Sequence, residues 1–71
     1  MGVVLFHTSS AAFRAEKLLL KHGLQAKLIP TPREYSSDCG IALRFDANQS
    51  EQVKTLLSSA HVDFASLHVA D

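Results

Sequence analysis

The sequence predicts an α+β fold in which a four-stranded antiparallel sheet carries two helices on one face. Short apolar runs alternate with two longer segments of helical periodicity, in the order strand, helix, strand, strand, helix, strand. The chain has 71 residues, a length that suits a single small domain, 1-71, and it contains no internal repeat. In so short a chain this order is typical of the split βαβ, or ferredoxin-like βαββαβ, arrangement.

The first part of the chain predicts a strand followed by a helix. Residues 2–7 are apolar at both alternating sets of positions, as in a central strand. The helix begins after the hydroxyl residues 8–10, which are good N-caps, and ends near residue 22, because Gly23 is typical of the position after a helix. Its apolar stripe comprises Ala11, Ala15, Leu18, Leu19 and His22. Phe13 and Leu20 lie off this stripe, where they either widen the core-facing band or form a contact patch for a partner.

The rest of the chain predicts two strands, a helix and a last short strand. Residues 24–29 and 40–45 alternate apolar and polar side chains in the manner of half-buried strands. Asn48 and Glu51 have capping-box spacing at the start of the second helix. The apolar stripe of that helix comprises Val53, Leu56, Leu57 and Ala60. Residues 64–69 are then expected to form the last strand.

The right-handed crossover rule predicts how these elements assemble. The first two strands point the same way, the third runs back between them, and the fourth pairs with the free side of the first. One end of the sheet then collects the start of the first helix, the loop 30–40 and the approach to the last strand. The residues expected to meet there are His7, Thr8, Ser9, Ser10, Arg33, Ser36, Ser37, Cys39, Gly40 and His61. A helix N-terminus favours an anion or a thiolate, and a glycine lets a ligand approach the backbone closely.

The face of the sheet without helices is expected to be partly apolar. Its predicted members are Ile29, Ala42, Phe64 and either Val4 or Phe6, mixed with Lys27, Arg44 and His68. An apolar surface of this extent on a small domain predicts a homodimer or a docking partner. The alternative is an open sheet that stays exposed.

Charge and cysteine content exclude several classes of protein. Seven basic residues balance seven acidic ones, which argues against nucleic-acid binding driven by phosphate contacts. The apolar run 3–6 is too short to span a membrane, and no signal sequence opens the chain. With one cysteine and no such signal, we expect a cytoplasmic protein without an internal disulfide. No residues have the spacing of a metal motif, so neither a metal nor a cofactor is predicted.

The loop 30–40 holds both prolines, the only cysteine and the only tyrosine, and it is the longest stretch without predicted secondary structure. LIPTPRE (28–34) and SSDCGIALRF (36–45) resemble the hallmark of the selenium/sulfur carrier protein-like family, a group of small bacterial domains. FHTSSA (6–11) and AEKLL (15–19) resemble the same family, so the likeness covers roughly the first two thirds of the chain. The resemblance implies a carrier of sulfur or selenium on some small α/β fold.

Two residues of the loop have alternative interpretations. Cys39 is either a reactive thiol or a small buried apolar residue, and the resemblance favours the reactive thiol. Arg33 either binds an anionic group or pairs with Glu34 or Asp38 and stiffens the loop.

We therefore expect a cytosolic sulfur or selenium carrier or accessory protein rather than a turnover enzyme. Cys39 would hold the atom as a persulfide or selenosulfide, and donor and acceptor proteins would be its partners. Ser36 and Ser37 either contact an anion or stabilise turns, and His7 and His61 are candidate acids or bases. The alternative is a non-catalytic module that binds a small anion or a protein at the same end and in which Cys39 only packs.

Overall fold

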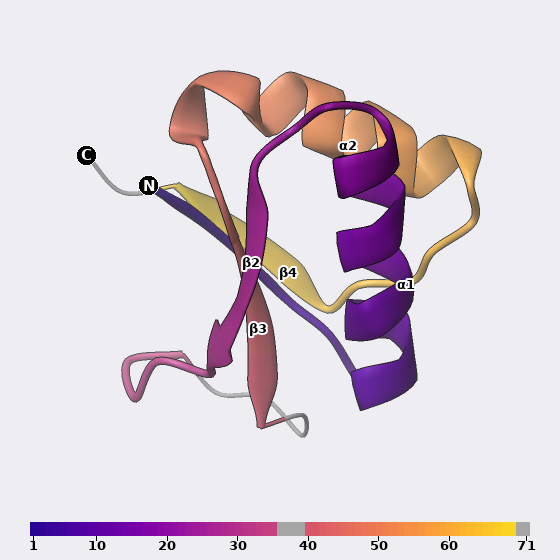
Figure 1. The fold of residues 1–71 in the computed structure, drawn as a ribbon. Helices are drawn as coiled ribbons and strands as arrows, with labels where there is room; N and C mark the ends of the chain where they lie inside the picture. The colour runs from indigo at the N-terminus through magenta and orange to yellow at the C-terminus, as the bar shows by residue number, and fades with distance from the viewer. Residues whose placement is uncertain (36–39, 70–71) are drawn as a thin grey trace.

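The fold comes from a computed structural model, which describes residues 1–35 and 40–69. The elements in chain order are β1 (Gly2–Leu5), α1 (Ser9–Lys21), β2 (Ala26–Pro30), β3 (Ile41–Phe45), the 3-10 helix η1 (Ala47–Gln49), α2 (Ser50–Ser59) and β4 (Ser66–Val69). The strands form one sheet in the order β2-β3-β1-β4, and each neighbouring pair is antiparallel. Both helices lie on one face of this sheet (Figure 1). The predicted α+β fold is confirmed, and its strand order is compatible with a ferredoxin-like fold.

The main core lies between the sheet and the helices. Val4 in β1 and Phe6 just after it are two residues apart, so they point to the same side of the sheet. Both side chains are fully buried. The helices contribute the buried residues Ala12, Ala15, Leu19, Val53 and Leu57. On α1 the predicted Ala15 and Leu19 are buried together with Ala12, the predicted Ala11 and Leu18 are partly buried against the core, and His22 is exposed. His22 instead holds the helix end, where its Nδ1 lies 3.0 Å from the Leu18 carbonyl oxygen.

The two helices end in the same backbone motif. After α1 the Leu24 N–H donates to the Leu19 carbonyl at 3.0 Å, and Gly23 between them has a φ of 77°. After α2 the Val62 N–H donates to the Leu57 carbonyl at 2.9 Å. Each is a Schellman motif whose last residue is apolar and buried against the core. The predicted glycine stop of the first helix is confirmed.

The second helix does not begin with the predicted capping box. The Asp46 carboxylate accepts a hydrogen bond from the Asn48 N–H at 3.0 Å and so caps η1, which leads into α2. The cap is therefore Asp46, and Asn48 is the residue whose N–H is capped. Glu51 lies 3.9 Å from the Lys54 ammonium on the exposed face of α2. The start of this helix was predicted wrongly.

The sheet face without helices carries a second, smaller apolar cluster. Its buried members are Val3, Leu5 and Ala42, and the partly buried Ile29 and Tyr35 pack against them. Ile29 and Ala42 were predicted on this face.

The assignment of Phe64, and of either Val4 or Phe6, to that face was wrong. Val4, Phe6 and Phe64 belong to the core under the helices. The phase of β1 could not be read from its sequence because the strand is apolar on both faces. No helix in the described ranges is long and apolar enough to cross a membrane.

Candidate functional site

A pocket of about 260 Å³ lies where α1 begins and α2 has ended. Its lining comprises His7, Thr8, Ser10, Ala11, Arg14, His61 and Asp63. The structure therefore brings together four of the residues predicted to meet at this end of the sheet: His7, Thr8, Ser10 and His61.

The start of α1 brings the positive end of a helix dipole to this pocket. The Thr8 hydroxyl accepts a hydrogen bond from the Ala11 N–H at 3.2 Å, which is the predicted N-cap. The first turn of α1 holds no acidic residue, so the positive end of the helix dipole is not offset from within the helix. Arg14 adds a full positive charge, whereas Asp63 among the described lining residues and the end of α2 oppose it. The helix start and Arg14 are the groups of this pocket that suit a small anion.

His61 reaches this pocket from a backbone conformation that histidine adopts infrequently. Its φ is 55°, and it takes the left-handed position in the Schellman motif that ends α2. In the corresponding motif after α1 the residue is Gly23. A non-glycine residue in this region costs on the order of 1 kcal/mol. The fold thus carries an imidazole at a position where glycine is the less strained choice.

None of the described residues of the loop after β2, 31–35 and 40, lines this pocket. The Tyr35 N–H donates to the Pro32 carbonyl at 3.1 Å, so residues 32–35 form a turn that exposes Arg33. Gly40 is exposed, and its carbonyl accepts from the Thr31 N–H at 3.1 Å, which closes the base of the loop. Within the described residues Arg33 forms no ion pair, including none with Glu34. Ser36, Ser37, Asp38 and Cys39 lie outside the described residues.

Tyr35 carries the loop onto the helix-free face of the sheet. Its ring stacks on the His68 ring with centroids 4.2 Å apart and planes 14° apart. The Ser66 Oγ lies 2.9 Å from the His68 Nε2, and this contact also holds the imidazole ring in place. His68 was predicted as a surface residue; it is partly buried in this contact instead.

Sequence reasoning missed four residues of this region. Arg14 lies one helical turn after Ser10, so helical spacing from the predicted N-cap could have found it. Asp63 follows His61 by two residues, so it could have been predicted as a member of the same site. No local pattern pairs Tyr35 with His68, because their contact depends on the path of a loop across the sheet.

In the part of the chain that the structure describes, no group of three or more histidine, cysteine, aspartate or glutamate side chains could hold a metal ion. The pocket offers two imidazoles, hydroxyls and a guanidinium, which suit hydrogen bonding to an anion and proton transfer.

The fold and the site define a small α+β protein with an anion-compatible pocket and a proline-rich loop at one end of its sheet. The chain belongs to the family described as "Putative Se/S carrier protein-like", whose model matches residues 1–69. No curated protein and no solved structure matches the chain.

Proposed function

We propose that the protein carries a sulfur or selenium atom on Cys39 between a donor and an acceptor protein in the cytoplasm. The observation that carries this proposal is the family match, which extends over residues 1–69 and includes the only cysteine of the chain. The family is named for carriers of sulfur and selenium, and a cysteine is the side chain that can hold either atom in a reversible covalent bond.

Loading needs no external oxidant when the donor is a persulfide. The Cys39 thiolate attacks the outer sulfur of the donor, a sulfur–sulfur bond forms on Cys39, and the donor leaves as a thiolate. An acceptor thiolate then attacks the same outer sulfur, and Cys39 leaves as the thiolate. For selenium the donor is a compound in which selenium joins two thiols. Cys39 displaces one thiol as thiolate and keeps the selenium with the other thiol attached.

One feature of the described residues supports this chemistry. Gly40, which follows Cys39 in the chain, is exposed, and a Cβ built there meets no atom of the other described residues within 4 Å. In this proposal the charged form of the thiol or of the donor is stabilised by Thr8, Ser9, Ser10, Arg33, Ser36 and Ser37. His7 and His61 move the protons.

The alternative proposal is a module that binds a small anion without covalent chemistry. The pocket of about 260 Å³ at the start of α1 favours it, because the helix end and Arg14 suit an anion without any contribution from Cys39. The two proposals differ in what they require of the thiol.

Mass spectrometry of the intact protein distinguishes them. Wild type and Cys39→Ser are incubated with a cysteine desulfurase and cysteine, and separately with the glutathione compound that holds one selenium between two sulfurs. The carrier proposal expects a gain on wild type alone that a thiol reductant removes. After the desulfurase the gain is one sulfur atom, and after the selenium donor it is one selenium atom together with one glutathione. A folded wild type whose thiol reacts with iodoacetamide but gains neither sulfur nor selenium contradicts the carrier, and sulfate or selenite binding by both proteins then favours the anion module.

A further inference from the structure

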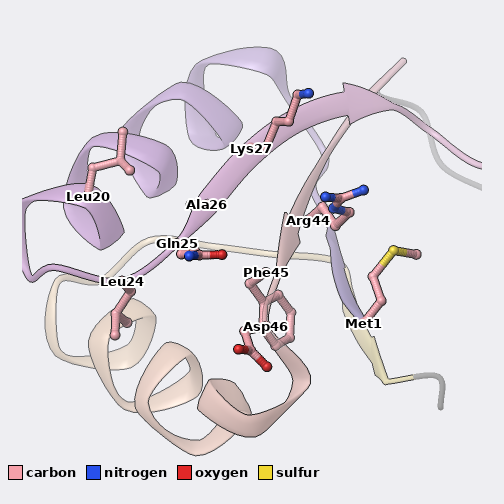
Figure 2. A pocket seen from close by; sticks show the side chains of 9 residues that line it. All are labelled: Met1, Leu20, Leu24, Gln25, Ala26, Lys27, Arg44, Phe45 and Asp46. Atoms are coloured by element: carbon pink, nitrogen blue, oxygen red, sulfur yellow. The ribbon is translucent and has the colours of Figure 1, made fainter.

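A second hollow lies at the opposite end of the sheet, where β1 and β2 begin and β3 ends (Figure 2). Its volume is about 710 Å³. The lining comprises Met1, Leu20, Leu24, Gln25, Ala26, Lys27, Arg44, Phe45 and Asp46. The carrier proposal gives this hollow no role.

Two cations stand side by side at this hollow. Lys27 on β2 is directly opposite Arg44 on β3, and like charges in that position destabilise a sheet. Neither side chain forms an ion pair with any described residue. The nearby Asp46 carboxylate is held by the Asn48 N–H as the cap of η1. Both cations are therefore available to an acidic group from outside the chain.

The adjoining strand β2 is an edge of the sheet, since among the described residues it pairs only with β3. The Thr31 N–H donates to the Gly40 carbonyl at 3.1 Å, directly after the last β2–β3 pair. Hydrogen-bonded and open pairs alternate along an antiparallel ladder, so the backbone groups of Ala26 and Leu28 point to the free edge. Pro30 has the same phase, which is where an edge strand tolerates a residue without an N–H.

The two sides of this edge differ in chemistry. Ala26 and Leu28 pack against the core under the helices, so Lys27 between them projects to the other face. On the helix side of the hollow, Leu20 of α1 is 53% exposed, and the mostly buried Leu24 also lines the hollow (Figure 2). An apolar wall thus lies on one side of the free edge, and the two cations lie on the other.

We propose that β2 is the docking site for an extended segment of a partner protein in which apolar and acidic residues alternate. The segment pairs with the free backbone groups of Ala26 and Leu28 as an additional strand. Its apolar side chains contact Leu20, and its acidic side chains lie beside Lys27 and Arg44. A second copy of this chain fits less well, because pairing two β2 strands would bring four cations to one surface.

Synthetic peptides test this proposal directly. The probe is a blocked hexapeptide of alternating valine and glutamate, and its control has lysine in place of glutamate. In a second control the backbone nitrogens that would face β2 are methylated, which removes the donors without changing the side chains. Amide NMR spectra of the wild-type chain are expected to show shifts at Ala26 and Leu28 with the glutamate peptide alone.

Charge reversal supplies the matched variants. Lys27→Glu with Arg44→Glu is expected to weaken binding of the glutamate peptide by about tenfold and to create binding of the lysine peptide. Lys17→Glu with Lys21→Glu makes the same change in net charge on the part of α1 that faces α2, and it is expected to leave binding within about twofold of wild type. Cys39→Ser is expected to bind like wild type, which separates this proposal from the carrier proposal.

Three results would overturn the docking proposal. One is binding of the glutamate peptide that the double reversal at β2 leaves unchanged. Another is a set of amide shifts confined to β4 or to the pocket at the start of α1. The third is sedimentation of the wild-type chain as a dimer in which the Ala26 and Leu28 amides are protected from hydrogen exchange.

Discussion

His61 is the residue at which the local backbone preference and the candidate site conflict. Its φ of 55° costs on the order of 1 kcal/mol relative to glycine, and Gly23 occupies the matching position after α1. A residue that keeps a strained conformation while its ring lines a polar pocket is a candidate for function.

Replacing His61 with glycine separates stability from function. We expect His61→Gly to raise the free energy of unfolding in urea by about 0.5–1 kcal/mol, because glycine adopts the left-handed region freely. Ala60→Gly is the control, since Ala60 has a φ of −91° and gains nothing from glycine. That variant should lose about 0.5–1 kcal/mol. A His61→Gly protein less stable than wild type would show that the imidazole makes a stabilising contact that outweighs the strain.

The loop between β2 and β3 contributes to packing, because its residue Tyr35 covers the apolar cluster on the helix-free face. Val3, Leu5 and Ala42 are each no more than 2% exposed. Most of the apolar surface that led us to expect a homodimer is therefore buried within the chain. The homodimer itself stays a prediction.

The contact between Tyr35 and His68 can be followed without a label. Tyr35 is the only tyrosine and the chain has no tryptophan, so its fluorescence reports the position of the loop. We expect His68→Ala to increase quenching of this fluorescence by acrylamide and to lower the free energy of unfolding by about 0.5–1.5 kcal/mol. His22→Ala, at the end of α1, should leave quenching unchanged. Equal quenching in wild type and His68→Ala would contradict the stacked arrangement.

The elements also show how far the sequence predicts this fold. Periodicity and the crossover rule predicted the strand order, because two helices and four strands leave few topologies for a short chain. They could not assign the faces of β1, whose four residues are all buried. They also predicted only some of the residues that line the pocket at the start of α1. The contact of Tyr35 could not be predicted, because Tyr35 follows β2 and meets His68 on β4 at the far edge of the sheet, and no spacing in the sequence encodes that contact.

At the scale of the whole molecule, the two proposed activities lie at opposite ends of one thin sheet. The molecule measures 28 × 27 × 16 Å, so its shortest dimension leaves room for little more than a sheet and one layer of helices. A body of this thickness offers little room for a closed pocket around a reactive group. Transfer without loss to water then depends on a partner that covers the reacting atoms.

This separation predicts that partner docking and thiol chemistry can be uncoupled. Gly40, next to Cys39 in the chain, precedes β3, and Arg44 lies near the other end of that strand, so the two are separated by about 13 Å of strand. Lys27→Glu with Arg44→Glu is expected to slow sulfur loading of Cys39 from a protein donor whose docking segment is acidic. The same variant should be loaded by glutathione persulfide at the wild-type rate, because a small donor needs no docking strand.

The control is again Lys17→Glu with Lys21→Glu, which should load at the wild-type rate from both donors. Stopped reactions followed by mass spectrometry measure both rates. Equal slowing with both donors would mean that the charge reversal acts on the thiol and not on docking. Unchanged rates with a protein donor shown to bind β2 would mean that docking there does not serve transfer. Slowing with the protein donor alone is the outcome that assigns recognition to β2 and chemistry to the loop, since each end then fails independently of the other.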